Sequence, residues 1–585
     1  MTRGRWAIRI RLSMSTDFQD IAGILTDGSG PFGPAELRAL VARGVGPSDA
    51  VIRSEEELAL AGFGRQKADK AENSTETFFL AGDTSQASEI WRSTQSVSAF
   101  GEGGAGAWAA IRVLSDQHRA WLSRDQFGQQ PLYYVEKAGS LAFSTSLSWF
   151  FDSGIVSRKF DSERFGELVQ LQFLAGASSP FVDIRRVSPG ETLVIERGRI
   201  VDRLRRPSVP LSDRRTVNHE AALDALDTHL SETLREAISR FTNDASGIGC
   251  VITGDLGSTV LAVALARSSK TKAYALVPVI VEGEKSRAAL KARMDFAAGL
   301  GLEAIAVSVK KEDFWKRLPE IAKAMTDPVA DHAALLWDAV AQAAANMDVA
   351  LVLPTGGQEL FGAYGRYRTA ARPLWLGGRA MRSRGHLQGL GRLPDGPAHW
   401  RDGMIAAENK IRGGSFSTIQ TLQLLDIATW LPNDTILGEH QLLHGTGVAV
   451  SRPYLEPMFA GFAFALPDQL KLRGQQGGRL LRHWLSRTYP AAQKLLEEER
   501  PGVPVSDWIA QEAGSLGAAV DAILADAQLM ARGQAKDIFT LLGSQPTKRL
   551  GMAAWQLLYF ACWYRIHVTG APVEGDVSSL LGTPN

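Results

Sequence analysis

The chain has 585 residues, of which 45% are hydrophobic and 22% charged, so it can form large buried cores without disulfide or metal staples. At roughly 100–200 residues per domain, this length predicts two to four domains. The formal net charge of +1 excludes a strong overall field that would attract nucleic acid or anionic membranes. Local basic clusters at 203–206 and 379–384 are interpreted as solvated surface or linker rather than phosphate-binding patches.

Two cysteines, Cys250 and Cys562, are too few and too distant for a disulfide framework or a cysteine-rich metal site. Cys250 lies in an apolar run, and we expect a buried core residue there rather than a nucleophile. The sequence contains neither a signal peptide nor an apolar run of about 18 residues. We therefore expect a cytoplasmic protein with no nucleic-acid partner and no membrane partner.

The pattern of the first 205 residues predicts mainly strands. Residues 6–12 alternate apolar and polar side chains, which is the period of a half-buried strand. We expect a helix at 160–173 and further strands at 107–114, 120–123, 132–136, 140–144 and 192–196. The Pro-, Ser- and Arg-rich stretch 203–215 is a candidate linker. These features predict a first domain over 1–205, a linker over 206–218 and a second domain over 219–585.

The second domain changes pattern, because short apolar strands now alternate with helices. The expected strands are 248–252, 273–281, 304–309 and 349–353, and the expected helices are 219–243, 258–267, 286–299, 314–325 and 333–345. Strands with near-continuous apolar runs are typical of parallel sheets that are buried on both faces. The alternation predicts a doubly wound parallel sheet, followed from about residue 420 by a mostly helical part.

Two loops after buried strands are candidate anion sites. The first loop consists of Thr253, Gly254, Asp255, Leu256, Gly257 and Ser258, and it leads into an apolar helix. Helix N-termini favour anions because their N–H groups and the helix dipole both point at the ligand. A plain turn with Ser258 as the N-cap explains this loop equally well. In the second loop, which contains Gly356 and Glu359, a structural turn is the default interpretation.

A third stretch, residues 123–134, contains an Arg-Asp pair beside Gly and Pro and is interpreted as a structural turn. We find no Walker-type loop, no His-Glu-x-x-His zinc helix and no Gly-x-Ser-x-Gly nucleophile elbow. The ten histidines are scattered and form no cluster in the sequence.

Taken in series, these stretches resemble the class-B asparagine synthetase family. Residues 124–134 look like its Arg-Asp-x-x-Gly-x-x-Pro-Leu-Tyr-Tyr, 253–258 its Ser-Gly-Gly-x-Asp-Ser, and 356–364 its Gly-Ala-Asp-Glu-Leu-Phe-Gly-Gly-Tyr. Residues 430–432 and 452–457 look like later landmarks. The resemblance implies an N-terminal Ntn-hydrolase-like, glutaminase-type αββα sandwich. It also implies a C-terminal ATP-pyrophosphatase-like domain that uses ATP and Mg²⁺.

The departures from the family pattern concern its reactive groups. Family glutaminases begin with Met-Cys, whereas this sequence has Thr2, so we do not expect it to hydrolyse glutamine. The metal-binding aspartates of the family fall at Gly257 and Gln358, while Glu359 is kept. Asp255 and Glu359 are candidates to hold Mg²⁺ in a shifted geometry, and loss of the metal site is the alternative.

The resemblance also suggests catalytic residues. Glu359 is one candidate, and Arg500 is the other, because Arg500-Pro501-Gly502 matches the Lys-x-Gly context of the β-lactam-forming branch. An arginine keeps the charge that stabilises a developing oxyanion or pyrophosphate, but it cannot shuttle protons. Residues 253–258 and Gly356 are the candidate nucleotide-binding residues.

A glutaminase-like domain without its cysteine is similar to the macrolactam-forming branch, which includes lasso-peptide cyclases. That branch implies an ATP-dependent amide-bond-forming ligase acting on a peptide or small carboxylate, with a precursor peptide and leader-processing proteins as partners. One alternative is a catalytically degenerate pseudoenzyme that binds peptides or acts as a scaffold. Another is an ammonia-dependent asparagine synthetase.

Overall fold

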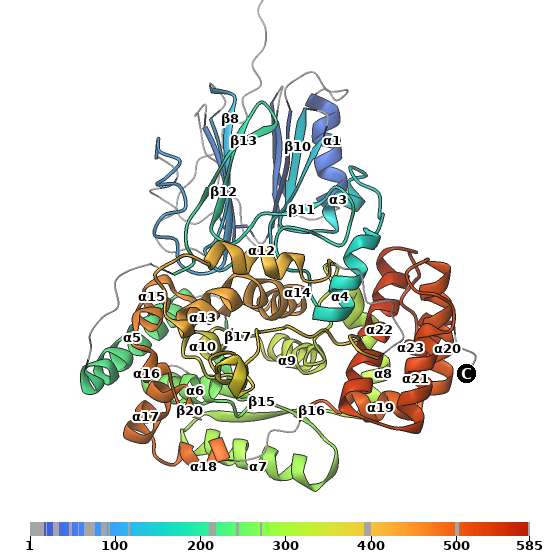
Figure 1. The fold of residues 1–585 in the computed structure, drawn as a ribbon. Helices are drawn as coiled ribbons and strands as arrows, with labels where there is room; N and C mark the ends of the chain where they lie inside the picture. Colours follow the sequence, from blue (N-terminus) through green and yellow to red (C-terminus); the bar gives the residue numbers. More distant parts are fainter. Residues whose placement is uncertain are drawn as a thin grey trace, which may run out of the picture. The chain divides into compact units, whose positions relative to one another are not determined.

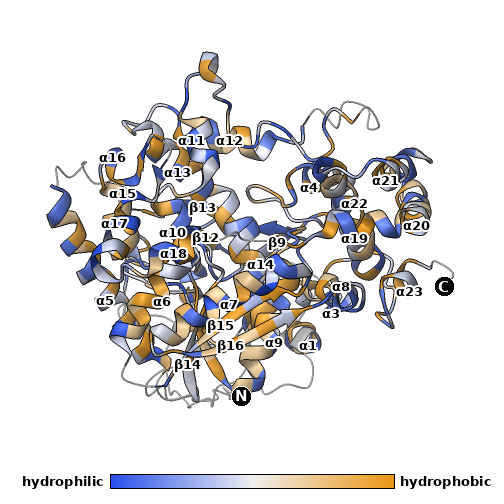
Figure 2. Ribbon diagram, turned by 90° about the horizontal axis from the view of Figure 1, so that it is seen from below, coloured by the Kyte–Doolittle hydropathy of each residue, from blue (hydrophilic) through white to orange (hydrophobic). Residues whose placement is uncertain are grey.

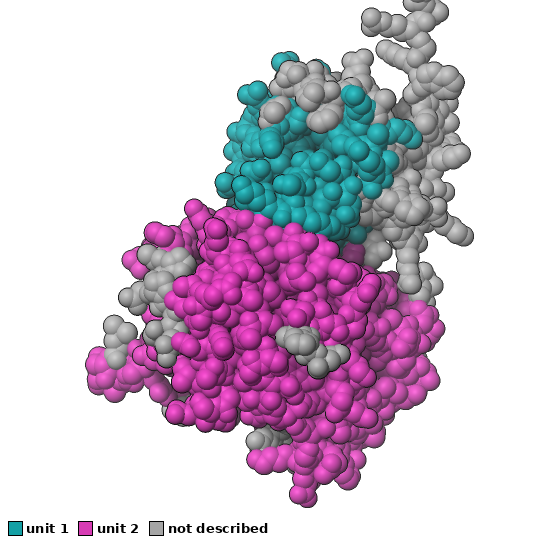
Figure 3. All heavy atoms as spheres, turned by 90° about the vertical axis from the view of Figure 1, so that its right-hand side faces the viewer, with its two compact units in different colours: residues 1–159, 177–208 teal, residues 160–176, 209–585 magenta. Residues whose placement is uncertain are grey.

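The structure is a computed structural model that describes residues 17–18, 20–26, 34–45, 50–55, 58–63, 76–82, 91, 94–114, 117–137, 139–209, 218–241, 245–269, 272–390, 399–474, 476–497 and 502–582. Its two compact units are Met1–Lys159 with Ala177–Ser208, and Phe160–Gly176 with Val209–Asn585 (Figure 3). Residues 160–176 thus belong to the second unit, although the sequence places them in the first domain. The strand predicted at 6–12 lies outside the described residues.

Unit 1 contains two six-stranded sheets that face each other (Figure 1). Their strand orders are β11-β9-β10-β3-β5-β4 and β13-β12-β8-β7-β6-β2, and almost all neighbouring pairs are antiparallel. Buried side chains from both sheets, such as Leu60, Phe79, Leu122 and Phe143, form one core. Helix α1 (Pro34–Val45) packs on β4 and β5. The expected two-sheet sandwich is confirmed.

The strands of unit 1 are β2 Asp17–Phe18, β3 Asp20–Thr26, β4 Ala50–Glu55, β5 Leu58–Phe63, β6 Glu76–Gly82, β7 Trp108–Leu114, β8 Arg119–Arg124, β9 Tyr133–Lys137, β10 Ser140–Ser144, β11 Arg185–Arg186, β12 Glu191–Glu196 and β13 Arg199–Arg205. The short helix α3 spans Trp149–Asp152. The prediction that the linker starts at residue 203 is wrong, because residues 203–205 are the end of strand β13. Most of β13 is exposed at the edge of its sheet, so no apolar run marks it as a strand.

The turn after β8 is held by Arg124 and Asp125, as interpreted from the sequence. The Arg124 guanidinium donates to three backbone carbonyls, those of Gln130 at 2.6 Å, Gly128 at 2.7 Å and Val187 at 2.8 Å. The Asp125 carboxylate accepts three backbone N–H groups, those of Phe127, Gln129 and Gln130. Both side chains are buried, so their hydrogen bonds replace the water that burial removes.

Unit 2 is built on a five-stranded sheet with the order β16-β15-β14-β17-β18, and every neighbouring pair is parallel. Its strands are β14 Gly247–Val251, β15 Ala273–Ile280, β16 Glu303–Val309, β17 Val349–Val352 and β18 Val450–Ser451. The chain runs outward from β14 to β16 and then returns to place β17 beside β14. The predicted doubly wound sheet is therefore confirmed, and its strand order reverses between β14 and β17. Ligands of such sheets bind beyond the carboxyl ends of the strands at this switch point.

Helices surround this sheet, whose strands β15 and β16 carry mostly apolar colouring in Figure 2. The helices nearest in sequence to the strands are α5 His219–Phe241, α6 Leu256–Ser268, α7 Gly283–Gly299, α8 Lys311–Ala324, α9 Ala334–Met347 and α10 Gly357–Leu360. The others are α4 Phe165–Leu171, α11 Gly365–Ala370, α12 Asp402–Ile411, α13 Thr418–Ala428, α14 Ile436–His444, α15 Pro457–Ala465, α16 Asp468–Lys471, α17 Arg479–Thr488, α18 Ala492–Glu497, α19 Val505–Gln511, α20 Ala513–Asp526, α21 Gln534–Ser544, α22 Lys548–His567 and α23 Val577–Leu581.

The predicted helical part beyond residue 420 is confirmed. Segment 160–173, expected to be one helix, is a 3-10 turn at Ser162–Arg164 followed by α4. Phe160 and Phe165 pack edge-to-face against Phe560 of α22, with ring centroids 5.4 and 4.9 Å away, which explains why this segment belongs to unit 2. None of the described helices is both long and apolar enough to cross a membrane.

Candidate active site

The first candidate loop connects β14 to α6 at the switch point of the sheet. Gly254 has a φ of +81°, and a Cβ at this position would lie 2.9 Å from Nε of Arg293 on α7. Both the left-handed backbone and the nearby guanidinium therefore require glycine here. Leu256, Gly257 and Ser258 form the first turn of the 13-residue α6. The first N–H groups of a helix have no partner within the helix, so this end of α6 has the polarity of an anion site.

Asp255 is the N-cap of α6, and its carboxylate accepts three hydrogen bonds. Oδ1 accepts the backbone N–H of Ser258 at 3.1 Å and the side-chain amide of Gln358 at 2.9 Å. Oδ2 accepts the hydroxyl of Thr253. A capping carboxylate stabilises the first helical turn and the positive end of its dipole. The Asp255 side chain thus closes its own loop and connects that loop to Gln358.

The second candidate loop follows β17 and leads into α10. Gly356 has a φ of +91°, and a Cβ there would lie 2.3 Å from Cδ2 of Leu455, so this position also requires glycine. From the first turn of α10, Gln358 extends its amide to Asp255. The structure therefore brings the candidate residues 253–258 and Gly356 into two neighbouring loops that are joined by side chains.

Thr355 anchors the second loop to a buried ion pair that is not recognised from the sequence. Its hydroxyl lies 2.7 and 2.8 Å from the carboxylate oxygens of Glu439 on α14, and Nε of Arg452 donates to the same carboxylate at 3.0 Å. Burial raises the pKa of Glu439, and Arg452 opposes that rise. Arg452 belongs to the 452–457 landmark, so one partner of the pair carried a sequence signal and Glu439 did not.

Glu359 lies beside Gln358 in sequence but faces a different neighbour. Its side chain is 2% exposed, and its Oε1 lies 4.0 Å from Nη2 of Arg366. Within the part of the chain that the structure describes, no hydrogen bond reaches this Oε1. Burial raises the pKa of Glu359 to about 7, with Arg366 lowering it and Asp426 raising it. A carboxyl group with this pKa can exchange protons near neutral pH, and its catalytic role stays a prediction.

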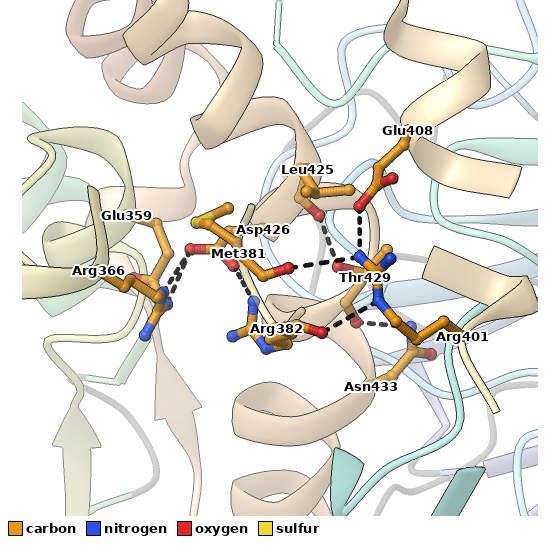
Figure 4. A network of polar contacts seen from close by, with 10 residues as sticks. All are labelled: Glu359, Arg366, Met381, Arg382, Arg401, Glu408, Leu425, Asp426, Thr429 and Asn433. Carbon is orange, nitrogen blue, oxygen red and sulfur yellow. Dashed lines mark hydrogen bonds and ion pairs between the residues drawn. The ribbon is translucent and has the colours of Figure 1, made fainter. Parts of the chain in front are cut away.

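A network of polar side chains centred on Asp426 lies beside Glu359, which contacts it through Arg366 (Figure 4). Asp426 on α13 is fully buried and accepts Nε of Arg366 at 2.9 Å and Nη1 of Arg382 at 2.6 Å. The guanidinium of Arg382 also lies 4.2 Å from the ring centroid of Trp430, in a cation–π contact. The interpretation of 379–384 as solvated surface is therefore wrong at Arg382, which is largely buried because it pairs with Asp426.

The sequence profile of the asparagine synthase family matches residues 229–565, which is more than half of the chain and includes both loops. The chain belongs to the asparagine synthase family. A glutamine amidotransferase domain profile matches residues 90–205. Together with the sheets described above, these matches confirm the predicted fold, a glutaminase-type Ntn-hydrolase-like sandwich followed by an asparagine synthase domain with a parallel sheet and helices.

The relatives are distant in sequence. Asparagine synthetase [glutamine-hydrolyzing] 1 of Bacillus subtilis (strain 168) is 21% identical over 79% of this chain and 78% of its own length. A putative asparagine synthetase [glutamine-hydrolyzing] of Mycobacterium tuberculosis (strain ATCC 25618 / H37Rv) is 22% identical over 77% and 74%. The solved glutamine phosphoribosylpyrophosphate amidotransferase of B. subtilis covers 58% of this chain and 76% of its own at 10% identity. The TM-score of this match is 0.20.

In this member of the asparagine synthase family, neither cysteine has the properties of a glutaminase nucleophile. Cys250 lies in β14 and Cys562 in α22, and burial raises the pKa of each thiol to about 12. Attack on an amide by cysteine requires the thiolate, which is scarce at neutral pH when the pKa is this high. Thr2 and the candidate catalytic residue Arg500 lie outside the described residues.

The side chains at the two loops do not fit the Mg²⁺ site that the family resemblance implies. Mg²⁺ favours carboxylate and phosphate oxygens, yet no group of three or more His, Cys, Asp or Glu side chains suited to a metal occurs among the described residues. Gln358 directs its amide N–H at Asp255, and Glu359 lies beside Arg366. The carboxylates of Asp255 and Glu359 therefore have hydrogen-bond donors as neighbours, whereas a bound cation would require further oxygen ligands.

Proposed function

We propose that this chain is an ATP-dependent carbon–nitrogen ligase of the macrolactam-forming, lasso-peptide cyclase type. The observation that carries this proposal is the pair of joined loops at the switch point of the sheet, above the N-terminus of α6. Backbone N–H groups and the helix dipole suit the phosphates of ATP there. Gly254 and Gly356 allow the close backbone turns that such a cradle requires.

In this reaction a substrate carboxylate attacks the α-phosphorus of ATP, and pyrophosphate leaves to give an acyl-adenylate. An amine of the same peptide then attacks the acyl carbon, AMP leaves, and the nitrogen releases a proton. The loop at residues 253–258 is proposed to bind the phosphates, and Glu359 to accept the proton. Arg500 is proposed to stabilise developing negative charge. Orientation of the carboxylate and the amine is the main contribution of the protein.

An amine source other than glutamine is supported by the two cysteines, whose buried thiols cannot serve as the glutaminase nucleophile. A peptide that carries both an amine and an Asp or Glu side chain would supply both reacting groups. This proposal makes a precursor peptide the substrate and leader-processing proteins the partners.

A second candidate, a pseudoenzyme that binds peptides or acts as a scaffold, is favoured by one specific observation. The Asp255 carboxylate is used for capping and for the contact with Gln358, so it offers little to a metal–phosphate complex. A third candidate is ammonia-dependent asparagine synthesis, in keeping with the names of the relatives.

The test measures ATP binding and peptide binding by calorimetry, and AMP release by chromatography, with the full chain. Three reactions are compared: a peptide with a free N-terminus and an Asp or Glu side chain, aspartate with ammonium, and aspartate with glutamine. A ligase of the proposed type releases AMP with the peptide, whose mass falls by one water. Peptide binding without AMP release would establish the scaffold role, and AMP release with ammonium would establish asparagine synthesis.

A matched pair of glycine variants shows whether the loop is responsible. Gly254→Ala strains a positive φ and directs a Cβ at Arg293, whereas Gly533→Ala strains a φ of +95° with nothing within 4 Å. We expect ATP binding and AMP release to be lost in Gly254→Ala and kept in Gly533→Ala. Equal effects of the two variants would show that the 253–258 loop does not bind the nucleotide.

A further inference from the structure

Two side chains 103 residues apart make the direct connection between the two candidate loops. Nε2 of Gln358 donates to Oδ1 of Asp255 over 2.9 Å. Gly257 of the first loop faces the second, and a Cβ there would stand 3.3 Å from Asp255 Oδ1 and 3.6 Å from the carbonyl oxygen of Pro354. The two loops thus lie in van der Waals contact at Gly257 and are joined beside it by the Gln358–Asp255 hydrogen bond.

The negative charge of Asp255 is balanced by neutral donors and by the helix. The Thr253 hydroxyl, the Ser258 N–H and the Gln358 amide all donate to this carboxylate. The positive end of the α6 dipole adds to their effect. A cation bound at Oδ1 would have to displace the Gln358 N–H, and Gln358 could act as a ligand only if its amide turned its carbonyl oxygen toward the cation.

We propose that the Gln358–Asp255 hydrogen bond takes the place of a divalent cation in joining the two loops, so that the loop pair of this chain forms without Mg²⁺. The inference rests on the proposed function only in treating the loops as a nucleotide site. The connection itself concerns the protein without nucleotide and can be tested in the absence of ATP.

The same geometry predicts how a cation site can be created. Gln358→Asp places a second carboxylate near Asp255, and two neighbouring carboxylates repel each other unless a proton or a cation lies between them. The variant should therefore unfold at a lower temperature in EDTA and recover when Mg²⁺ is added. At a cation concentration 100 times the dissociation constant, the recovery amounts to about 3 °C for a unit of this size.

The experiment uses the full chain without nucleotide and two readouts. Mn²⁺, which shares the preference of Mg²⁺ for oxygen ligands, is counted by electron paramagnetic resonance, and thermal unfolding is followed in EDTA and in Mg²⁺. We expect the wild type to bind no Mn²⁺ that depends on Asp255, and its unfolding temperature to be the same in EDTA and in Mg²⁺. Gln358→Asp should bind Mn²⁺ and should unfold at a higher temperature in Mg²⁺ than in EDTA. Asp255→Asn and Gln358→Ala should lower the unfolding temperature equally in EDTA and in Mg²⁺.

One bound Mn²⁺ in the wild type that disappears in Asp255→Asn would overturn the inference, because it would reveal a cation site at the capping carboxylate. The wild-type comparison decides the matter even if Gln358→Asp does not fold. Failure of the proposed ligase function would show itself separately, as absent ATP binding in a protein whose loops still form without cations.

Discussion

Replacement of Asp426 by asparagine tests whether charge holds the buried arginine–aspartate network together. The carboxylate of this fully buried residue accepts hydrogen bonds from Arg366 at 2.9 Å and from Arg382 at 2.6 Å. Burial raises the pKa of Asp426, but the two guanidinium groups outweigh that effect and hold the pKa below its usual value. Asparagine preserves the shape of the side chain but leaves Arg382 without its balancing charge and Arg366 with only the more distant carboxyl of Glu359.

The expected loss follows from the cost of an unpaired buried charge. Removing one partner from a buried ion pair costs about 3–5 kcal/mol. A unit of roughly 400 residues has an unfolding entropy of about 0.8 kcal/mol/K, so Tm should fall by about 4–6 °C at pH 7. Because the pKa of Asp426 is lowered in the folded state, this carboxylate contributes its full stabilisation at pH values above the ordinary pKa of 3.8. It is lost as the pH falls through the folded pKa, so the difference between variant and wild type should narrow in acid.

Scanning calorimetry of the full chain measures this change, with Asp402→Asn as the control. Asp402 is exposed and pairs with His399, so its loss should shift Tm by less than about 1 °C. Adding Arg382→Met to Asp426→Asn removes one of the unpaired charges and should recover part of the loss. A fall of less than about 1 °C in Asp426→Asn would refute the view that charge stabilises this network.

Three further predictions concern other buried polar groups. Glu359→Gln should abolish a decline in wild-type stability of about 3 kcal/mol between pH 5 and pH 8, measured by calorimetry. The decline is expected because the folded pKa of about 7 exceeds the ordinary 4.5, so the folded state binds the extra proton and loses stability as the pH rises. Thr355→Val removes the hydroxyl that contacts the Glu439 carboxylate and should cost about 1.5–3 kcal/mol in urea unfolding. Arg124→Lys cannot reproduce the three-carbonyl fork and should destabilise unit 1 by about 2–3 kcal/mol, whereas the exposed Arg119→Lys should change its unfolding little.

The sheet of unit 2 is predictable from the sequence because its strands are buried on both faces. Runs such as 248–252 and 349–353 are short, apolar and followed by helices, so each carries its own local signal. Strand β13 carries no such signal, since it lies at the edge of its sheet with mostly exposed side chains. The sequence does not reveal that segment 160–176 belongs to unit 2, because its aromatic contacts involve Phe560, about 400 residues away.

Some residues of the candidate site can likewise be recognised from the sequence, and others cannot. Gly254 and Asp255 are recognisable because the strand, the loop and the helix that define them are contiguous. The amide that holds Asp255 belongs to Gln358, and the sequence shows that residue only as a departure from the family pattern. The pair of Arg366 and Asp426 carries no local signal, because a long-range ion pair does not alter the pattern of either of its segments. Contacts of this kind depend on the tertiary fold.

The landmark at 452–457 explains how the loops can keep their shape while their carboxylates change. Arg452 holds Glu439, which in turn contacts the hydroxyl of Thr355 in the second loop. Two residues further on, the buried Tyr454 donates its hydroxyl to the carbonyl of Gly257 at 3.0 Å in the first loop. One short segment thus supports both loops through hydrogen bonds that do not involve the altered carboxylate positions. Because backbone N–H groups, rather than the altered side chains, supply most of an anion cradle at a helix N-terminus, a change of carboxylates alters the cation requirement of such a site more than its phosphate-binding geometry.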